Sequence, residues 1–190
     1  IDKVDEKEES SWNEQIQEWK VKHPLKYRGK GSLSPQYVIE KLYELTEGKG
    51  IITTEVGQNQ MWASQFYKYS EPKTFITSGG LGTMGFGLGA AIGASLGNPD
   101  RKVINIAGDG SFKMNSTELA TVSKYKLPLV QLVLNNHTLG MVRQWQDLFF
   151  QGNFSQSTLG PDVDFLKLAN AYGIKSFLIS SNEEVEDVLK

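Results

Sequence analysis

The sequence contains no cysteine among its 190 residues. Disulfide bonds and thiolate chemistry are therefore excluded, although this absence does not indicate a compartment. The sequence also lacks a secretory pattern, a polybasic segment and any apolar run of about 18 residues, and its formal net charge is only −2. These features argue against a membrane span and against nucleic acid or a lipid surface as a partner. We therefore expect a cytoplasmic protein.

Hydrophobic residues make up 39% of the chain and charged residues 22%, which is enough for one sizeable core. From residue 35 onward, strand-like and helix-like segments alternate. This pattern predicts an α/β fold with a doubly wound, mainly parallel sheet and helices on both faces. The expected strands are 50–56, 74–77, 102–107, 129–134 and 175–179, and the expected helices are 35–45, 58–67, 82–96, 115–125, 140–150, 165–172 and 183–189.

Residues 1–34 differ from the remainder, which we expect to form one domain over 35–190. The first residues are crowded with charges, and Trp12, Ile16 and Trp19 then recur at helical spacing. We expect a short amphipathic helix there, followed by a linker. Its apolar stripe predicts that something covers the helix, either its own domain or a domain outside these residues.

The most informative motifs follow two of the expected strands. Gly108-Asp109-Gly110-Ser111 closes the strand at 102–107, and Asn135-Asn136 closes the strand at 129–134. A helix is expected between them, so the three elements form a βαβ unit. Because such crossovers are right-handed and join parallel strands, both motifs should open on the same edge of the sheet. Asp109 and Asn136 are thereby expected to converge.

Ligand chemistry indicates what these residues could bind. A carboxylate, an amide oxygen and a nearby main-chain carbonyl suit Mg²⁺, which phosphate oxygens and water usually complete. Gly110 permits close approach of the backbone, and Ser111 begins a run of free amides that favour phosphate. Each half alone is an ordinary turn or strand end. Together they match the signature of thiamine diphosphate enzymes.

Four segments are similar to the C-terminal, diphosphate-binding domain of acetolactate synthase. The resemblance extends from about Pro35 to Lys190 and is most specific in Gly79–Gly87 and Gly140–Trp145. The segments that carry it are Val56–Trp62, Ser78–Gly87, Gly108–Leu119 and Asn135–Trp145.

The resemblance implies that Asp109, Asn136 and the main-chain carbonyl of Thr138 hold Mg²⁺. Many family members carry histidine where this chain has Asn59, and an amide can bind phosphate but cannot titrate near neutral pH. Gly89 likewise stands where proline is common. The positions matching cofactor-binding residues are Val56, Gln58, Asn59, Gly82, Met84, Gly110, Ser111, Leu139, Gly140 and Met141.

Met84 and Trp145 each have two interpretations. A methionine at a glycine-rich helix start is most often a filler of irregular space. The resemblance instead implies that Met84 wedges between the two cofactor rings, while the Gly82 carbonyl accepts from the aminopyrimidine. An isolated tryptophan on a helix is usually core or interface. The resemblance implies that Trp145 lines the acceptor pocket and favours 2-ketobutyrate over pyruvate.

The implied reaction condenses pyruvate with a second 2-ketoacid, either pyruvate or 2-ketobutyrate, with loss of CO₂ in branched-chain amino acid synthesis. The cofactor supplies the electron sink and the protein supplies orientation. Family enzymes also use FAD and a glutamate on other domains, and their active sites lie at subunit interfaces in homodimers or homotetramers, with a possible regulatory subunit. We therefore expect these residues to be a fragment that does not turn over alone.

Three alternatives remain open. A pyruvate oxidase or another ketoacid carboligase shares the same motifs, and a non-catalytic binding module is also compatible with them. Gly80–Gly85 moreover fits G-x-G-x-x-G between a strand and a helix, and the acidic Asp109 ends the next strand, as a dinucleotide-binding fold requires. Against the last alternative, Asn135-Asn136 has no role in such a fold.

Overall fold

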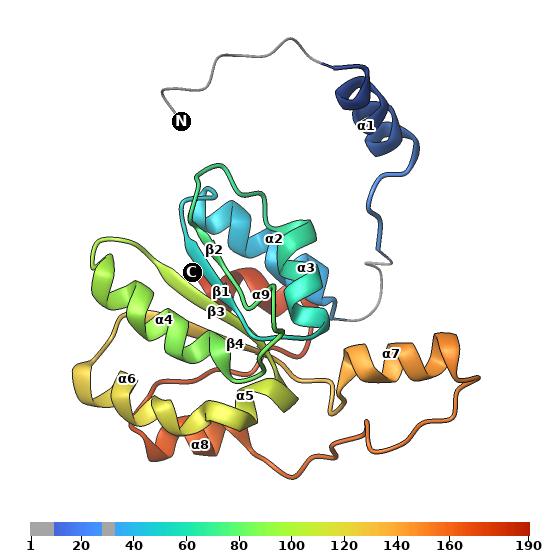
Figure 1. Ribbon diagram of the computed structural model, residues 1–190. Coiled ribbons are helices and arrows are strands. Elements are labelled where there is room, and N and C mark those ends of the chain that lie inside the picture. The colour runs from blue at the N-terminus through green and yellow to red at the C-terminus, as the bar shows by residue number, and fades with distance from the viewer. Residues whose placement is uncertain (1–9, 28–32) are drawn as a thin grey trace.

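The computed structural model describes residues 10–27 and 33–190 and shows helices around one parallel sheet (Figure 1). The predicted α/β class is confirmed. The strands are β1 (Ile51–Thr54), β2 (Phe75–Ile76), β3 (Val103–Gly108) and β4 (Leu129–Leu134). The helices are α1 (Ser11–Lys22), α2 (Pro35–Thr46), α3 (Gln58–Phe66), α4 (Phe86–Gly97), α5 (Asp109–Asn115), the 3-10 helix η1 (Ser116–Glu118), α6 (Leu119–Tyr125), α7 (Gly140–Phe149), α8 (Phe165–Ala171) and α9 (Asn182–Leu189).

The four strands lie in the order β2-β1-β3-β4, and every neighbouring pair is parallel. Ile51 of β1 is opposite Val103 of β3, and Gly108 at the end of β3 is opposite Leu134 at the end of β4. The winding direction reverses between β1 and β3. In open parallel sheets, ligands bind outside the carboxyl ends of the strands at such a reversal. A ligand site is therefore expected at the residues that follow β1 and β3.

Both faces of the sheet are covered, because alternate strand residues point to opposite sides. Ile52, Ile104 and Ile106 pack with α2 and α3 on one face. Ile51 and Val103 pack against α4 on the other. Figure 1 shows α2, α3 and α9 on the first side and α4, α6 and α8 on the second. Two covered faces explain why β1 and β3 are buried along almost their whole length.

Two helices start elsewhere than the sequence predicts. A helix was expected over 82–96, but α4 begins at Phe86 because Gly82 and Gly85 have φ of 62° and 89°. A right-handed helix cannot contain such residues, so this segment is a turn. The helix expected over 115–125 is divided into α5, η1 and α6, and α5 begins as early as Asp109.

The strand expected at 175–179 is absent: this segment is irregular and pairs with no strand among the described residues. Its apolar residues Phe177 and Leu178 are consecutive, not alternating, and both side chains are exposed. A strand at the edge of a sheet needs a main-chain partner as well as apolar residues. This prediction was wrong because propensity alone does not supply the partner.

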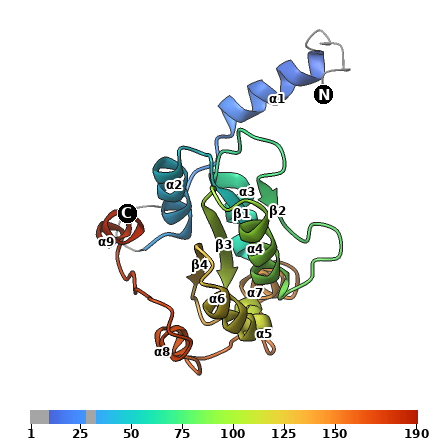
Figure 2. The ribbon, with the colours of Figure 1, turned by 90° about the vertical axis from the view of Figure 1, so that its left-hand side faces the viewer.

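The expected amphipathic helix near the N-terminus exists as α1, which lies apart from the sheet in both views (Figures 1 and 2). None of its residues is buried, and the Trp12 and Trp19 rings contact each other edge to face at 5.5 Å. Of the two interpretations of its apolar stripe, packing on its own domain is therefore contradicted. Among the described residues, no helix combines the length and hydropathy that a membrane crossing requires.

Candidate functional site

The ends of β3 and β4 bring the two motifs to one edge of the sheet. Because Gly108 and Leu134 are paired, Asp109 and Asn135-Asn136 emerge from neighbouring strands in the same direction. This is the parallel arrangement that the βαβ pattern predicts. Asp109 is also the first residue of α5, so its carboxyl group and the free amides of that helix lie together.

Asp109 is the most unusual polar residue of this edge. Its side chain is only 2% exposed, and its Oδ1 atom has no hydrogen-bond partner among the described residues. Burial raises the pKa of the Asp109 carboxyl, against the opposing effects of nearby main-chain N–H groups, Lys113 and His137. An unpartnered buried oxygen costs free energy that folding alone does not recover. Its donor chemistry fits a hard cation such as Mg²⁺.

The loop after β4, which leaves the strand end paired with that of β3, carries amide, hydroxyl and carbonyl oxygens. The Asn136 side-chain oxygen accepts from the Thr138 main-chain N–H at 3.1 Å, and the Thr138 hydroxyl donates to the Asn136 carbonyl at 3.1 Å. A facing segment holds the loop in place, since the Leu139 N–H donates to the Ser157 carbonyl at 2.8 Å. The loop therefore has a defined shape although Asn136 itself is exposed.

Two glycines let neighbouring side chains approach the main chain more closely than any larger residue would allow. A Cβ atom on Gly110 would lie 2.6 Å from Cδ2 of Leu139. A Cβ atom on Gly140 would lie 2.2 Å from Oε1 of Gln58 and 3.2 Å from Nδ2 of Asn136. Both glycines stand at helix starts, where free N–H groups favour anions. The side chains of Leu139 and Gln58 therefore lie directly over the main chain at these two glycines.

Residues after β1 meet the same edge from the other side. Gln58 donates from Nε2 to Oε1 of Gln144 in α7 at 3.0 Å. Asn59 is buried and donates to the main-chain carbonyls of Glu55 and Ile106 at 3.0 and 2.9 Å. The carboxamide of Asn59 therefore joins β1 and β3 at the reversal of winding. The structure gives this predicted ligand a structural role.

The glycine-rich turn before α4 lies against the end of β1. A Cβ atom on Gly82 would lie 3.9 Å from Cγ1 of Val56, and the Thr83 N–H donates to the Ser78 hydroxyl at 3.0 Å. Val56, shortly after β1, and Met84, in this turn, are both partly buried. Ser111, the remaining predicted phosphate contact, is buried and its hydroxyl donates weakly to the Gly108 carbonyl at 3.4 Å.

Trp145 is not gathered with these residues. It lies on α7, which extends away from the sheet and has no buried residue (Figure 1). Its side chain is 59% exposed and meets Phe149 edge to face at 5.6 Å. Met141 is partly buried near the start of the same helix. The structure thus separates the predicted acceptor residue from the predicted phosphate residues.

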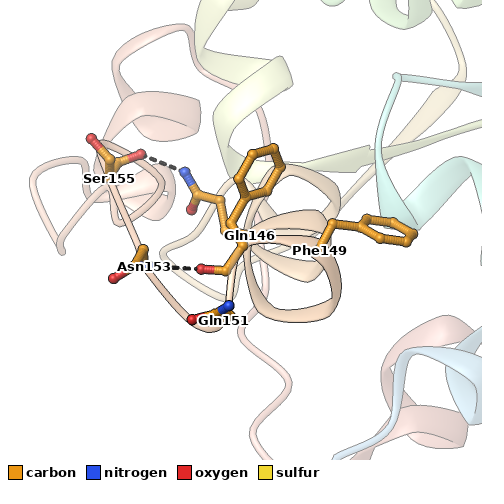
Figure 3. Close-up of a pocket in the computed structure, with 6 residues that line it drawn as sticks. Gln146, Phe149, Gln151, Asn153 and Ser155 are labelled. Carbon is orange, nitrogen blue, oxygen red and sulfur yellow. Dashed lines mark hydrogen bonds between the residues drawn. The ribbon is translucent and has the colours of Figure 1, made fainter.

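An open hollow of about 530 Å³ lies at the far end of α7. Figure 3 shows the Gln146 side chain reaching the Ser155 carbonyl, to which it donates at 2.9 Å. None of the predicted cofactor or metal residues lines this hollow. We therefore do not assign it as the cofactor site. The lining residues are Gln146, Phe149, Phe150, Gln151, Asn153 and Ser155.

Sequence reasoning missed three residues that the structure places at the site. They are Glu55 at the end of β1, Asn115 at the end of α5, and Gln144 in α7. Glu55 could have been noticed, because it follows a buried strand as Asp109 does. Asn115 and Gln144 carry no local signal, since their contacts are with residues distant in the sequence.

Comparison with protein families identifies the kind of domain that carries this edge of the sheet. The family model for "Thiamine pyrophosphate enzyme, C-terminal TPP binding domain" matches residues 55–190. The chain belongs to this family. The match begins directly after β1, includes the ends of β3 and β4, and therefore contains every residue of the candidate site. Within this TPP-binding domain, the dinucleotide-binding alternative for Gly80–Gly85 is not supported, and that turn follows the edge strand β2 instead of a central one.

Similar proteins carry a more specific name. The chain is 46% identical to acetolactate synthase 1, chloroplastic, of Nicotiana tabacum, covering 95% of this chain and 28% of that protein. It is 45% identical to the acetolactate synthase large subunit of Haemophilus influenzae, covering 95% and 32%. It is 45% identical to acetolactate synthase isozyme 3 large subunit of Escherichia coli, covering 94% and 31%. The chain thus spans about a third of these relatives.

Proposed function

We propose that this chain is the cofactor-binding part of an acetolactate synthase. The whole enzyme would condense pyruvate with pyruvate or 2-ketobutyrate and release CO₂ in branched-chain amino acid synthesis. The names of its relatives support the activity, and the TPP-binding family supports the cofactor. The observation that carries the proposal is the buried, unpartnered Oδ1 of Asp109 beside two glycine-lined helix starts.

In this proposal, Asp109, the Asn136 side chain and the Thr138 carbonyl hold Mg²⁺. Within residues 10–27 and 33–190, no three His, Cys, Asp or Glu side chains gather as a metal site. A cation here would consequently depend on a single carboxylate, on amide and carbonyl oxygens, and on phosphate oxygens. That set suits Mg²⁺, which is usually bound by one or two carboxylates together with phosphate and water.

The diphosphate would lie against the main chain of Gly110, Ser111, Leu139 and Gly140. Helix starts at α5 and α7 supply N–H groups and favourable dipoles. Gln58 and Asn59 approach the same point from β1, and Val56 lies beside the turn before α4. Gln58 bonds Gln144 through one N–H of its amide, and the second N–H could donate to a phosphate.

When bound, thiamine diphosphate supplies the electron sink that decarboxylation of a 2-ketoacid needs. The chain's own residues orient the reactants. Met84 and the Gly82 carbonyl would hold the two rings in the bent form that brings the amino group close to the reacting carbon. Met141 and Trp145 would face the acceptor. The indole of Trp145 can contact the extra methyl group of 2-ketobutyrate, which gives partial selectivity.

The remaining assignments concern the whole protein. We propose that it works as a homodimer or homotetramer in the cytoplasm and that FAD is bound mainly outside this chain. Two relatives are named large subunits, which supports a regulatory partner. Residues 35–190 are proposed as the cofactor-binding domain, with residues 1–34 as linker and helix. By itself this domain is proposed to bind cofactor without turning over.

Thermal unfolding tests the cofactor assignment directly. A ligand that binds only the folded chain raises the melting temperature, and the rise grows with the logarithm of the ligand concentration relative to its Kd. Thiamine diphosphate with Mg²⁺ should raise it, whereas NAD⁺ with Mg²⁺ should not. A rise in melting temperature with NAD⁺ but none with thiamine diphosphate would reverse the assignment. Product analysis of pyruvate turnover by the whole enzyme, in which this chain is joined to its other domains, then separates acetolactate synthase from pyruvate oxidase, which would release acetyl phosphate or acetate instead.

A further inference from the structure

The carboxylate of Glu55 is fully buried at the end of β1 and is bonded to the start of α4. Its Oε2 accepts from the Gly85 N–H at 2.7 Å, and its Oε1 accepts from the N–H groups of Gly87 and Leu88 at 2.9 and 3.3 Å. Thirty residues of sequence separate Glu55 from Gly85. A side chain of one element thus caps a helix of another.

The helix needs this cap because its own N-terminal residue cannot supply one. The cap position is Gly85, which has no side chain and a left-handed backbone with φ of 89°. Free N–H groups and the helix dipole at this end favour a negative charge. Burial raises the pKa of the Glu55 carboxyl, and the N–H groups of Gly85, Leu88 and Gly87 oppose that rise. The hydrogen bonds therefore compensate a buried carboxylate.

Asn115 binds the same residue from the opposite side. Its Nδ2 donates to the Gly85 carbonyl at 3.1 Å, and a Cβ atom on Gly85 would lie 3.5 Å from the Cβ of Asn115. Asn115 ends α5, the helix that begins at Asp109. Gly85 is consequently fixed at its N–H by the end of β1 and at its carbonyl by the end of α5.

The start of α4 packs very closely against the sheet. A Cβ atom on Gly87 would lie 2.5 Å from Oδ1 of Asn105 and 2.8 Å from the main-chain N of Glu55. The helix backbone therefore rests directly on the sheet. Close contact fixes the depth of α4, while Glu55 and Asn115 fix the orientation of the residue that follows Met84.

We propose that Glu55 and Asn115 are positioning residues that hold the Gly82–Gly85 turn, and with it Met84, in place for the cofactor rings. The proposal rests on the proposed function, in which Met84 and the Gly82 carbonyl contact the rings. It has a specific consequence, because the proposed metal residues and the main-chain phosphate contacts follow β3 and β4 and do not belong to the Gly82–Gly85 turn. Loosening the turn should weaken binding of the rings and leave binding of the diphosphate intact.

The test compares thiamine diphosphate with inorganic pyrophosphate, each with Mg²⁺, by calorimetric titration of the full chain. Glu55→Gln keeps the size of the side chain but replaces one acceptor oxygen with a donor that opposes an N–H group. Its affinity for thiamine diphosphate should fall about tenfold, as expected for a lost hydrogen bond to a charged group. Its affinity for pyrophosphate should stay within about twofold of the wild type. The near-ultraviolet circular dichroism of the bound cofactor should also change.

Glu44→Gln is the matched control, because that carboxylate is exposed on α2 and bonds Lys41. It should leave both affinities unchanged. If Glu55→Gln does not unfold cooperatively, Asn115→Ala replaces it, with Asn98→Ala at the other end of α4 as its control.

Equal binding of thiamine diphosphate by wild type and by the folded variant would overturn the proposal. Equal losses for both ligands would overturn it as well, because they would show a general effect on folding. Failure of the wild type to bind either ligand would instead refute the proposed function. The two failures are therefore distinguishable.

Discussion

The side-chain amide of Asn59 donates to the main-chain carbonyl of Ile106 at 2.9 Å and thereby links α3 to the interior of β3. The same amide donates to the Glu55 carbonyl at 3.0 Å. Two donors on one nitrogen are needed for this pair of bonds, and asparagine provides them without a charge. This chain therefore holds the junction of β1 and β3 by a side chain that does not titrate near neutral pH.

Replacing Asn59 tests that link. A neutral imidazole has one N–H group, so Asn59→His should leave one buried carbonyl without its donor and lower the free energy of unfolding by about 1–3 kcal/mol. Asn59→Asp should cost at least as much, because it places a carboxylate against two carbonyls. Urea unfolding measures both. Gln65→His on the exposed face of α3 should change little, and an unchanged Asn59→His protein would contradict the assigned bonds.

Asp109→Asn should have opposite effects on stability and on ligand response. The variant removes a buried charge whose Oδ1 has no partner, so the ligand-free protein should become more stable by about 1 kcal/mol. Its stabilisation by thiamine diphosphate with Mg²⁺ should disappear, because the cation loses its carboxylate. Thermal unfolding with and without both ligands measures the two effects. Asp162→Asn, at an exposed pair with Lys113, should retain the response.

Gly140→Ala should weaken cofactor binding without unfolding the protein. The added methyl group would lie 2.2 Å from Oε1 of Gln58, whose flexible side chain can move at the expense of its bond to Gln144. We expect the free energy of unfolding to change by less than about 1 kcal/mol. The affinity for the cofactor should fall by about tenfold or more, because the methyl group would stand where the diphosphate is proposed to approach the main chain. Titration calorimetry gives the affinity. A variant that binds as tightly as the wild type would place the phosphate elsewhere.

Gly93→Ala is the matched control for that experiment. A Cβ atom on Gly93 would meet nothing within 4 Å, and the residue lies inside α4. Helix propensity should then raise the free energy of unfolding by about 0.5–1 kcal/mol. Its affinity for the cofactor should equal that of the wild type.

Tyr27 gives a pH-dependent prediction. Burial and the hydrogen bond to Glu40 raise the pKa of the Tyr27 hydroxyl to about 12. Because the folded pKa exceeds the unfolded one, near 10, this contribution is present below about pH 10 and is lost as the pH rises towards 12. Tyr27→Phe should thus be about 1 kcal/mol less stable at pH 8, and the difference should shrink above pH 10. Denaturant unfolding across this range measures it.

The control for Tyr27 is Tyr125→Phe, since Tyr125 is 60% exposed. That variant should match the wild type at every pH. A constant difference for Tyr27→Phe up to pH 12 would contradict the hydrogen bond to Glu40.

Trp145→Ala tests acceptor selection in the whole enzyme, in which this chain is joined to its other domains. The indole is 59% exposed, so stability should change by less than about 0.5 kcal/mol. The ratio of acetohydroxybutyrate to acetolactate should fall by about tenfold, because one methylene group contributes only about 1–3 kcal/mol to discrimination. Competition between pyruvate and 2-ketobutyrate measures the ratio. Leu148→Ala, exposed on the same helix, should preserve it, and an unchanged ratio in Trp145→Ala would remove Trp145 from the acceptor pocket.

Most of the sheet could be predicted because its signals are local. The buried run at 103–108 and the partly buried run at 129–134 stand as mainly apolar segments in the sequence, and the turns that follow carry Asp109 and Asn136. The wrong strand at 175–179 had apolar residues but no partner. The late start of α4 was missed because a glycine-rich segment fits both a helix and a turn until φ is known.

The sequence by itself determined the order of the elements and the motifs that end β1, β3 and β4, since strand period, glycine turns and βαβ handedness depend on neighbouring residues. Only the tertiary structure decided which of these side chains are already engaged. Glu55 caps α4 across 30 residues and Asn59 reaches a carbonyl 47 residues away, whereas Asp109 has an oxygen with no partner among the described residues. Such contacts depend on how the chain closes on itself, because burial and hydrogen-bond geometry are set by packing between distant segments.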